Sequence, residues 1–473
     1  MSELLLESLR LWSPEVILGV GAMVVMLLGG PRATRLARLV VACAAVALAW
    51  AQRPSSAEPF FGLIILDPFA NVFRWAALAT IGLVVLMASS SSEVDERWRG
   101  EYLGVLLVVG VGLMLMAQAN HLLMAYLAME TVSLGSYLLV ALVRDGRASE
   151  AALKYLLFGA LSSGVMLFGM SWLFGLSGQL AFSSIRASLA GVGPPLAQAC
   201  VFAVGLMVVG LAFKISMVPF HMWTPDVYEG APVPVTALLS VGPKAAGLAL
   251  LLRLAGVLQP LWGMVAPVVV VLAMVTMTLG NVAALVQQNV KRLLAYSTIG
   301  QVGYLLIGLS VHTPRGLEAL LVYLAAYLFM NLGLFACVTA VVQHTGDETV
   351  SAFRGLAKRS PVLALCCALF LLSLAGLPPL FGFIGKFLLF GAAIDAQLIA
   401  LAVVGVLNSA VALYYYVNII RQMYLLAPER SGPLRVSRPV RLALAVCAAA
   451  TMLLGVFPGP LLSWLGGVVA GVL

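Results

Sequence analysis

The sequence predicts an all-α polytopic membrane protein, and its composition and apolar pattern are the two observations that predict it. Hydrophobic residues make up 62% of the 473 positions and charged residues only 10%, which is unlike a soluble domain. About fourteen apolar runs approach the roughly 20 residues that cross a bilayer as a helix. None of these runs alternates with a period of two, which argues against a membrane β-barrel.

Turn-forming and charged residues separate the predicted spans. In chain order the runs are Glu15–Gly30, Leu36–Trp50, Pro68–Ser89, Tyr102–Gln118, Leu122–Val143, Ala152–Leu176, Leu196–Met222, Ala231–Ala255, Trp262–Val286, Arg292–Leu309, Leu317–Val342, Pro361–Ala393, Gln397–Tyr424 and Val440–Leu473. The segments between them are too short for a soluble catalytic domain. We therefore expect one continuous helical bundle embedded in the membrane.

The basic residues predict how the chain is oriented. With the N-terminus outside and the spans alternating, seventeen basic residues fall in inner loops and six on the outer side. The inner set is Arg32, Arg35, Arg38, Arg97, Arg99, Arg144, Arg147, Lys291, Arg292, Arg354, Lys358, Arg359, Arg421, Arg430, Arg435, Arg438 and Arg441. The outer set is Arg10, Arg53, Arg74, Arg186, Arg253 and Arg315. Because cytoplasmic loops are enriched in Lys and Arg, we expect both termini outside.

Two predicted spans are over-long and contain helix-breaking residues. The first is the stretch Leu196–Asp226, interrupted near Pro219, and the second is Pro361–Ala393, interrupted within AGLPPLFGFIGKF. A proline inside a helix removes a hydrogen bond and clashes with the preceding turn. Interrupted helices at matching positions of two halves are typical of inverted-repeat transporters, whose sites lie near the membrane midplane.

The two interruptions divide the chain into units, because they fall in the seventh and twelfth predicted spans. Residues 1–100 would form three N-terminal helices, and residues 101–256 a first five-helix repeat with broken helix 196–226. Residues 262–425 would form a second repeat with broken helix 361–393, and residues 426–473 a C-terminal helix. An odd number of helices per repeat makes the repeats inverted. The units share no visible sequence identity, so span count and broken helices alone support the division.

Five ionisable residues within predicted spans are the candidates for function, because charges at membrane depth are costly and usually functional. Glu130 lies well inside its span, Lys214 lies shortly before the first break, and Lys244 follows a Gly-Pro pair. For these three the alternative is a structural ion pair that fixes helix packing. Lys386 and Lys154 lie nearer the ends of their spans, so the alternative for them is snorkelling to the membrane interface.

Together these residues predict a proton relay. Burial lowers the pKa of a lysine and a neighbouring carboxylate restores the charged form, so a lysine with a changing carboxylate neighbour takes up and releases a proton. Polar side chains expected to link the lysines are Ser216, His221, Ser240, Gln287, Gln288, Tyr296, Ser297, Thr298 and Gln301. His312 is expected to be an interface histidine, and His221 has that role as its alternative.

Other classes of site lack their motifs in this sequence. The six cysteines lie in apolar runs without a CxxC pair, which argues against disulfides and iron–sulfur clusters. No GxxxxGK[ST] loop, HExxH motif or ligand-spaced Cys/His cluster is present, so we expect no NAD, flavin, metal or nucleotide on this chain. Basic residues are not interleaved with aromatics as in nucleic-acid grooves. The start, MSELLLESLRLW, lacks the basic region of a cleaved signal peptide.

Three stretches carry a resemblance to a known family. KISMVPFHMWTPDVYEGAPVPVTALLS, NVKRLLAYSTIGQVGYLLIGL and LAGLPPLFGFIGKF resemble the proton-translocating, antiporter-like membrane subunits of respiratory complex I. The form PFHMWTPDVYEGAPVPV is most similar to the subunit N type of bacterial NADH–quinone oxidoreductase, and EAALKYLLFGALSSG fits that type too. The resemblance covers nearly the whole chain. It implies fourteen helices with two inverted five-helix repeats, each containing a broken helix.

The resemblance also implies roles for the five ionisable residues. Glu130 matches the family's essential fifth-helix glutamate, and Lys214 matches the lysine of the broken seventh helix. Lys244 matches the central lysine of the eighth helix, Lys386 the lysine of the broken twelfth, and Lys154 a sixth-helix lysine of the subunit N type. Members of the subunit M type usually carry glutamate at the twelfth-helix position, so Lys386 argues against that type.

The implied function is proton translocation from the cytoplasm outward, coupled to quinone reduction elsewhere in NADH–quinone oxidoreductase. Other membrane and peripheral subunits would be the partners and would bind NADH, FMN, iron–sulfur clusters and quinone. The implied location is the bacterial inner membrane, with many spans. Two alternatives remain open at this point: a subunit of a cation/proton antiporter complex, and a structural membrane subunit without its own proton path.

Overall fold

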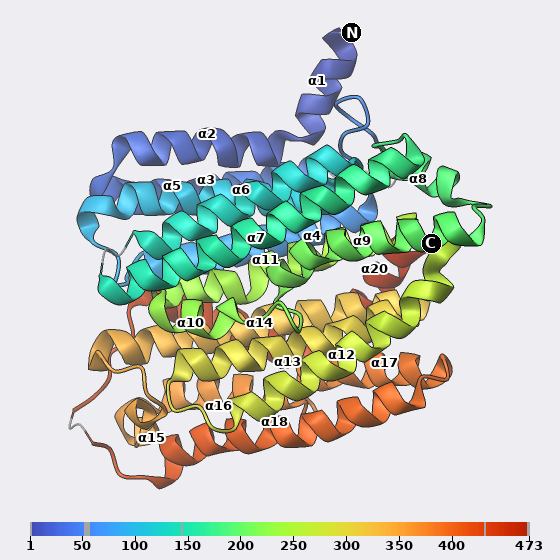
Figure 1. The fold of residues 1–473 in the computed structure, drawn as a ribbon. Coiled ribbons are helices and arrows are strands. Elements are labelled where there is room, and N and C mark those ends of the chain that lie inside the picture. Colours follow the sequence, from blue (N-terminus) through green and yellow to red (C-terminus); the bar gives the residue numbers. More distant parts are fainter. Residues whose placement is uncertain (1, 52–56, 143–144, 430–431, 471–473) are drawn as a thin grey trace.

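The computed structural model describes residues 2–51, 57–142, 145–429 and 432–470, and helices that lie roughly side by side make up the bundle (Figure 1). In chain order the helices are α1 (Ser2–Leu11), α2 (Ser13–Leu28), α3 (Gly30–Ala51), α4 (Pro68–Ala88), η1 (Glu96–Trp98), α5 (Arg99–Gln118), α6 (Leu122–Ala141), α7 (Gly146–Ser177), α8 (Phe182–Leu189), α9 (Pro194–Ile215), α10 (Trp223–Gly230), α11 (Val233–Val257), η2 (Gln259–Leu261), α12 (Trp262–Ala284), α13 (Val290–Val311), α14 (Pro314–Thr345), η3 (Val350–Phe353), α15 (Leu356–Arg359), α16 (Pro361–Ala375), α17 (Phe381–Asp395), α18 (Ile399–Leu425), α19 (Arg438–Val456) and α20 (Gly459–Val469).

The length and hydropathy of these helices confirm the predicted fold class. Within the described part of the chain, twelve helices are long and apolar enough to cross a membrane, and α2, α16 and α20 are shorter apolar helices. Isolated bridges between loop residues are the only β-structure among the described residues. The exact number of spans and the inverted repeats stay predictions.

Both over-long segments are interrupted where the chain carries helix breakers. α9 ends at Ile215 and α10 begins at Trp223, while α16 ends at Ala375 and α17 begins at Phe381. Each first half ends on a left-handed residue, Ser216 (φ 64°) and Gly376 (φ 91°). A glycine is the usual choice there, so Ser216 needs support from its surroundings. Thr224 supplies it by donating from Oγ1 to Ser216 Oγ over 2.7 Å.

The predicted continuous run Val440–Leu473 is divided in the structure. α19 ends at Val456 and α20 begins at Gly459. Pro458 and Pro460 explain the division, because neither has the backbone N–H that a continuing helix requires. α7 shows the opposite difference, since it begins two turns before the predicted start at Ala152 and extends beyond its apolar part.

Three basic residues counted as loop charges are paired with carboxylates, and of these Arg74 and Lys291 are buried and Arg253 is partly buried. The pairs are Glu15–Arg74, Asp67–Arg253 and Lys291–Glu348, with N–O distances of 2.7, 2.8 and 2.5 Å. A buried cation is costly unless a partner compensates its charge, and only the fold brings these partners together. Of the other counted residues, Arg53, Arg144 and Arg430 lie outside the described residues.

The centre of the bundle consists of α11, α13 and α14, which are buried around almost their whole circumference. α7, α12 and α18 lie at the periphery and present apolar side chains outward. Figure 1 also places α10 and α15 toward one end of the bundle, and α8 and α20 toward the other. We call these the α15 end and the α8 end. The central helices carry the polar residues described next.

Candidate functional site

Glu130 and Lys214 lie close together but do not form a direct ion pair. Among the described residues, the Lys214 ammonium donates to Ser133 Oγ over 3.0 Å, and Ser163 Oγ donates to the Glu130 carboxylate over 2.5 Å. Ser133 and Glu130 are three residues apart on α6, so they share one helix face. The two charges are near enough to interact electrostatically. Each member of the expected Glu130–Lys214 pair thus hydrogen-bonds a different serine hydroxyl in place of the other charge.

Lys214 is fully buried in the last turn of α9, directly before the helix interruption. A cation in the last turn of a helix interacts favourably with the unpaired carbonyl groups there. His221 lies within the interruption itself and is 7% exposed, and its Nδ1 has no hydrogen-bond partner among the described residues. The sequence thus correctly associated a lysine and a histidine with the first break.

Lys244 lies in the centre of the molecule, fully buried in the middle of α11. Within the described part of the chain, its ammonium has no hydrogen-bond partner. It faces the rings of Trp223 and Tyr228 instead, at 4.8 and 5.2 Å from Nζ to the ring centres. The charges of Lys214 and Lys244 are also near enough to interact.

A polar path begins one turn from Lys244 and crosses into the second half of the chain. Asn331 Nδ2 donates to Ser240 Oγ over 2.7 Å, and the Tyr327 hydroxyl contacts the Ser240 carbonyl at 2.9 Å. The same hydroxyl lies 3.1 Å from Thr298 Oγ1. These contacts connect α11, α14 and α13 through side chains that are at most 1% exposed.

The path continues around Gln301, one turn along α13 from Thr298. Gln301 Nε2 lies 3.2 Å from the Tyr416 hydroxyl and 3.5 Å from the carbonyl oxygen of Leu374. Tyr416 also hydrogen-bonds Ser297, and Tyr323 donates to Gln301. Gln301 thereby reaches the end of α16, where the second helix interruption begins.

Lys386 completes the series on the other side of that interruption. Its ammonium donates to the carbonyl oxygens of Leu374 and Ala375 over 3.0 and 3.2 Å and to Ser409 Oγ over 3.1 Å. It also lies 4.4 Å from the ring centre of Tyr304. The residue is 3% exposed, so the ammonium does not snorkel to the interface. Leu374 O is shared with Gln301, which links Lys386 to the path.

Lys154 lies apart from this path, in a cluster of ionised side chains toward the α15 end. The cluster, called the charged cluster below, consists of Arg147, Glu150, Lys154, Asp226, Glu229 and Arg292 and lines a cavity of about 220 Å³. The Lys154 ammonium pairs with Glu150 at 2.8 Å and Asp226 at 3.1 Å, and its side chain is 41% exposed. Lys154 is therefore a partly solvated residue and not a buried lysine like the other three.

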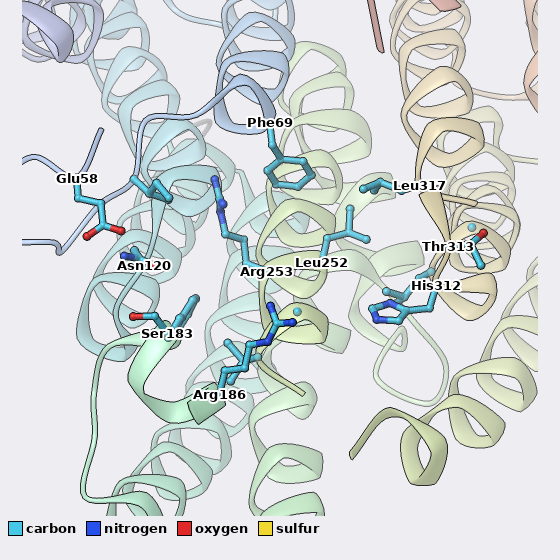
Figure 2. Close-up of a pocket in the computed structure, with 16 residues that line it drawn as sticks. Glu58, Phe69, Asn120, Ser183, Arg186, Leu252, Arg253, His312, Thr313 and Leu317 are labelled. Carbon is cyan, nitrogen blue, oxygen red and sulfur yellow. The ribbon is translucent and has the colours of Figure 1, made fainter. Parts of the chain in front are cut away.

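A second polar cavity, of about 250 Å³, lies toward the α8 end and is shown in Figure 2. Glu58, Arg186, Arg253 and His312 contribute its charged and titratable groups. Arg253 is held by Asp67, whereas His312 stacks on Trp262 at 4.0 Å between ring centres. Burial, and then the charge of Arg186, lower the pKa of His312, so its imidazole stays largely neutral near pH 7. This state fits the expected interface histidine.

Several residues of the path were not predicted from the sequence: Tyr304, Tyr323, Tyr327, Asn331, Ser409 and Tyr416. The sequence spacing could have indicated some of them. Tyr327 and Asn331 lie four residues apart in an apolar run, and Ser409 and Tyr416 lie seven apart. Such spacing places polar groups on one helix face. Of the predicted linking residues, Ser240, Ser297, Thr298 and Gln301 belong to the path. Tyr296 is partly exposed, and the Gln287 side chain donates to the carbonyl oxygen of Ala283.

Comparison with known proteins places this arrangement in a family. Residues 119–412 match the family described as NADH:quinone oxidoreductase/Mrp antiporter, TM. NADH-quinone oxidoreductase subunit N 2 of Sorangium cellulosum (strain So ce56) is 43% identical, covering 96% of both chains. A chain of respiratory complex I from Thermus thermophilus with bound aureothin is 33% identical, with a TM-score of 0.81 over 95% of this chain and 98% of that one.

A further solved structure shares the fold at lower identity. It is a chain of the Mrp complex from Dietzia sp. DQ12-45-1b, 23% identical with a TM-score of 0.88, covering 99% of this chain and 97% of that one. The family match spans more than half of the chain, and the Sorangium relative is similar over nearly all of it. The chain therefore belongs to the NADH:quinone oxidoreductase/Mrp antiporter family of membrane proteins.

Proposed function

We propose that this chain is a proton-translocating membrane subunit of a bacterial NADH–quinone oxidoreductase. The buried lysines Lys214, Lys244 and Lys386 carry the proton, and Glu130 modulates the charge of Lys214. The observation that carries this proposal is the buried polar path from Ser240 to Lys386. Three lysines and a chain of hydroxyl and amide groups at membrane depth are costly to maintain. A role in helix packing alone would not require these polar side chains to form one continuous path.

Each lysine would act by the same elementary step. A neutral amine accepts a proton on Nζ and becomes an ammonium, then releases the proton to the next group along the path. Hydroxyl and amide groups such as Tyr327, Thr298 and Gln301 both donate and accept hydrogen bonds, so they relay protons without holding charge. Water molecules would bridge the remaining gaps, as they commonly do between buried polar groups.

Glu130 would set the charge of Lys214 across the hydroxyls of Ser133 and Ser163. A carboxylate a few ångströms beyond an ammonium stabilises its charged form in a low-dielectric site. Because the two charges are not locked in a direct ion pair, a small movement of α6 relative to α9 would change their interaction strongly. This arrangement suits a switch better than a fixed structural ion pair does.

The direction of transport follows from the expected orientation. With seventeen basic residues in inner loops, the α15 end faces the cytoplasm and the α8 end the outside of the bacterial inner membrane. Protons would enter near Lys214, pass Lys244 and leave near Lys386. The charged cluster with Lys154 lies at the cytoplasmic side in this orientation and would serve the uptake side. The polar cavity shown in Figure 2 lies at the outer side.

The redox chemistry would belong to other subunits of the same enzyme. They would bind NADH, FMN, iron–sulfur clusters and quinone, and this chain would contact some of them within the membrane. The proposed contribution of this chain is therefore proton transport driven by quinone reduction elsewhere.

A subunit of a cation/proton antiporter complex is the second candidate, because the Mrp complex chain has the same fold. Purification of the tagged chain from its native membrane separates the two. An NADH:quinone oxidoreductase copurifying with the chain supports the proposal. A complex that exchanges sodium for protons and lacks NADH oxidation favours the alternative.

The functional test uses Lys214, the buried lysine beside Glu130. Lys214→Ala removes the proton carrier, and Lys214→Arg keeps a charge that effectively cannot deprotonate. We expect both variants to assemble and both to lose most proton uptake, measured with a pH-sensitive dye in inverted vesicles during NADH oxidation. Lys358→Ala is the control, since Lys358 is an exposed lysine on α15.

The arginine variant distinguishes a titrating group from a fixed charge. Loss of transport in Lys214→Ala together with full transport in Lys214→Arg would mean that a permanent charge suffices. Normal transport in both variants would favour the structural membrane subunit without its own proton path.

A further inference from the structure

The ammonium of Lys244 faces aromatic rings and no anion. The residue is fully buried in α11, and Nζ makes no hydrogen bond with any described residue. The centres of the Trp223 and Tyr228 rings lie 4.8 and 5.2 Å from Nζ. An aromatic face attracts a cation through its quadrupole, most strongly where water is excluded, and attracts a neutral amine far less. The two rings therefore offset, without a counter-ion, part of the cost that burial and the nearby charge of Lys214 impose on the ammonium.

Both rings belong to α10, a helix of eight residues that follows the first interruption. Contacts on the side of the first repeat hold Trp223 in place. Its Nε1 donates to the carbonyl oxygen of Phe213 over 2.9 Å, and the Tyr155 ring stacks on it at 4.3 Å with an interplanar angle of 11°. The position of these rings relative to Lys244 thus depends on where α10 lies.

Asp226 provides a second set of contacts that hold α10 in place. It lies between Trp223 and Tyr228 in the sequence, and its two carboxylate oxygens bind different helices. Oδ2 accepts from Lys154 of α7 over 3.1 Å, and Oδ1 accepts from Arg292 of α13 over 2.7 Å. One side chain therefore connects α10 to a helix of each half of the chain. Because α10 is so short, a restraint on Asp226 also restrains both rings.

We propose that Trp223 and Tyr228 form a cation–π site for the charged form of Lys244, and that Asp226 is the positioning residue of this site. The inference rests on the proposed relay and assigns to Lys244 a mode of charge stabilisation that differs from its neighbours. Lys214 has a nearby carboxylate, and Lys386 has carbonyl oxygens and a serine hydroxyl in addition to the Tyr304 ring, whereas Lys244 faces rings and has no hydrogen-bond partner among the described residues. At Lys244 the proton is stabilised by rings that cannot accept it, so it passes onward and is not trapped on a neighbouring base.

Lys154 acquires a role through this arrangement. Its ammonium lies in the charged cluster, outside the polar path, yet it binds Asp226. A movement of α7 relative to α13 would change the ion pairs of Asp226 with Lys154 and Arg292. It would thereby change the distance between the rings of α10 and Lys244. The charged cluster would then couple the helices of the two halves to the central lysine without carrying the proton itself.

The cation–π site is tested by graded fluorination of Trp223. Tryptophan analogues with one to four ring fluorines are incorporated at this position in the assembled complex by stop-codon suppression. Fluorine withdraws charge from the ring face with little change of shape. We expect the logarithm of the proton-transport rate to fall steadily with the number of fluorines, by about tenfold over the series. The same series at the peripheral Trp172, on α7, is the control and should be flat.

A spectroscopic measurement keeps the test independent of transport. The ¹⁹F resonance of a fluorotryptophan at position 223 should shift when Lys244→Met removes the cation, and should not shift in Lys358→Met. A flat fluorination series at Trp223, or a ¹⁹F resonance unaffected by Lys244→Met, would overturn the cation–π site.

Asp226 is tested by combining its variants with the fluorinated series. Asp226→Asn weakens the contacts with Lys154 and Arg292, so the rate should become less sensitive to fluorine. Asp226→Glu, which keeps the charge, should restore part of the sensitivity. Glu150→Gln removes a partner of Lys154 that lies outside α10 and should leave the sensitivity unchanged. If Asp226→Asn lowers every rate equally and keeps the fluorine sensitivity, its role is structural and the positioning proposal is wrong.

These outcomes are distinguishable from failure of the proposed function. Normal proton transport in Lys244→Met would show that Lys244 is not part of the relay, regardless of the result of the fluorination series. Loss of transport in Lys244→Met with a flat fluorination series would retain the relay and reject only the cation–π site.

Discussion

At the scale of single residues, Lys386 shows how a helix interruption accommodates a buried cation. Its ammonium binds the last carbonyl oxygens of α16, at Leu374 and Ala375, which the interruption leaves without intrahelical partners. The negative end of the α16 dipole therefore compensates the charge in place of a carboxylate. The neighbouring Gly376 leaves room for the side chain, since a Cβ there would lie 2.9 Å from Lys386 Cδ.

The first prediction separates a titrating Lys386 from a permanent cap of α16. Lys386→Arg retains the positive charge and the donors, so we expect assembly and NADH oxidation to survive in part. Because arginine effectively cannot release its proton, transport measured by dye-reported uptake in vesicles should be lost. Near-normal proton transport in Lys386→Arg would instead assign this residue to capping alone.

Glu93 provides a pH-dependent prediction outside the spans. Burial raises the pKa of Glu93 above its ordinary value, despite the charge of Lys291 and the hydrogen bond from the Val233 amide, which lower it. The folded-state pKa thus exceeds the unfolded one. The corresponding stability is fully present below the unfolded-state pKa and is lost as pH rises through the folded-state pKa.

Glu93→Gln should remove this loss, because a neutral amide does not ionise. We expect the Tm of the variant in detergent to equal that of the wild type near pH 4 and to exceed it near pH 8. Glu96→Gln serves as the control, since the Glu96 side chain is 84% exposed. A lower Tm for Glu93→Gln at pH 8 would mean that attraction to Lys291 outweighs the cost of burial.

At the scale of elements, the packing of α17 against α16 depends on a glycine. Gly382 lies in the first turn of α17, and its amide donates to Ser373 Oγ over 3.1 Å. A Cβ built on Gly382 would overlap the carbonyl oxygen of Ser373, which is a backbone atom and has little freedom to move. This close approach places Lys386, one turn further along α17, against the end of α16.

Gly382→Ala should therefore destabilise the protein by about 1–3 kcal/mol through overpacking. It should also reduce proton transport, because displacement of α17 moves Lys386 from its carbonyl partners. Thermal unfolding in detergent and the vesicle assay measure the two effects. Gly391→Ala is the matched control on the same helix, since a Cβ there meets no atom within 4 Å. Equal stability of the two variants would contradict the proposed constraint.

At the scale of the whole molecule, orientation decides the direction of transport. The split of basic residues predicts that the loop after α4 faces the cytoplasm and the loop after α7 the outside. Cysteine placed at the exposed position Ser92 should resist a membrane-impermeant thiol reagent in intact cells, whereas Gln179→Cys should react. The unmodified chain with its six cysteines gives the background. Labelling of Ser92→Cys but not of Gln179→Cys would reverse the direction of the proposed transport.

The sequence by itself determined the fold class, the approximate spans, the two interruptions and the candidate ionisable residues within the spans. These features are local. A run of apolar residues must become a helix in lipid, and a proline or an isolated lysine within that run can be recognised from the sequence without knowing how the helix packs. For the same reason Lys214 and Lys244 were predicted to be buried before any contact was known, whereas for Lys386 snorkelling to the interface stayed open as the alternative. Lys154 was named with them, although its exposure depends on how far α7 extends beyond the membrane.

Only the tertiary structure decided which of these residues meet. The bonds of Lys214 to Ser133 and of Ser163 to Glu130, the path through Tyr327 and Gln301, and the attachment of Asp226 to two helices all join segments distant in sequence. The periodicity of a span shows which residues share a face, but in a bundle that is apolar on nearly every side it does not show which face meets which neighbour. Side-chain packing between helices fixes that choice, and with it the order in which a proton would pass from one lysine to the next.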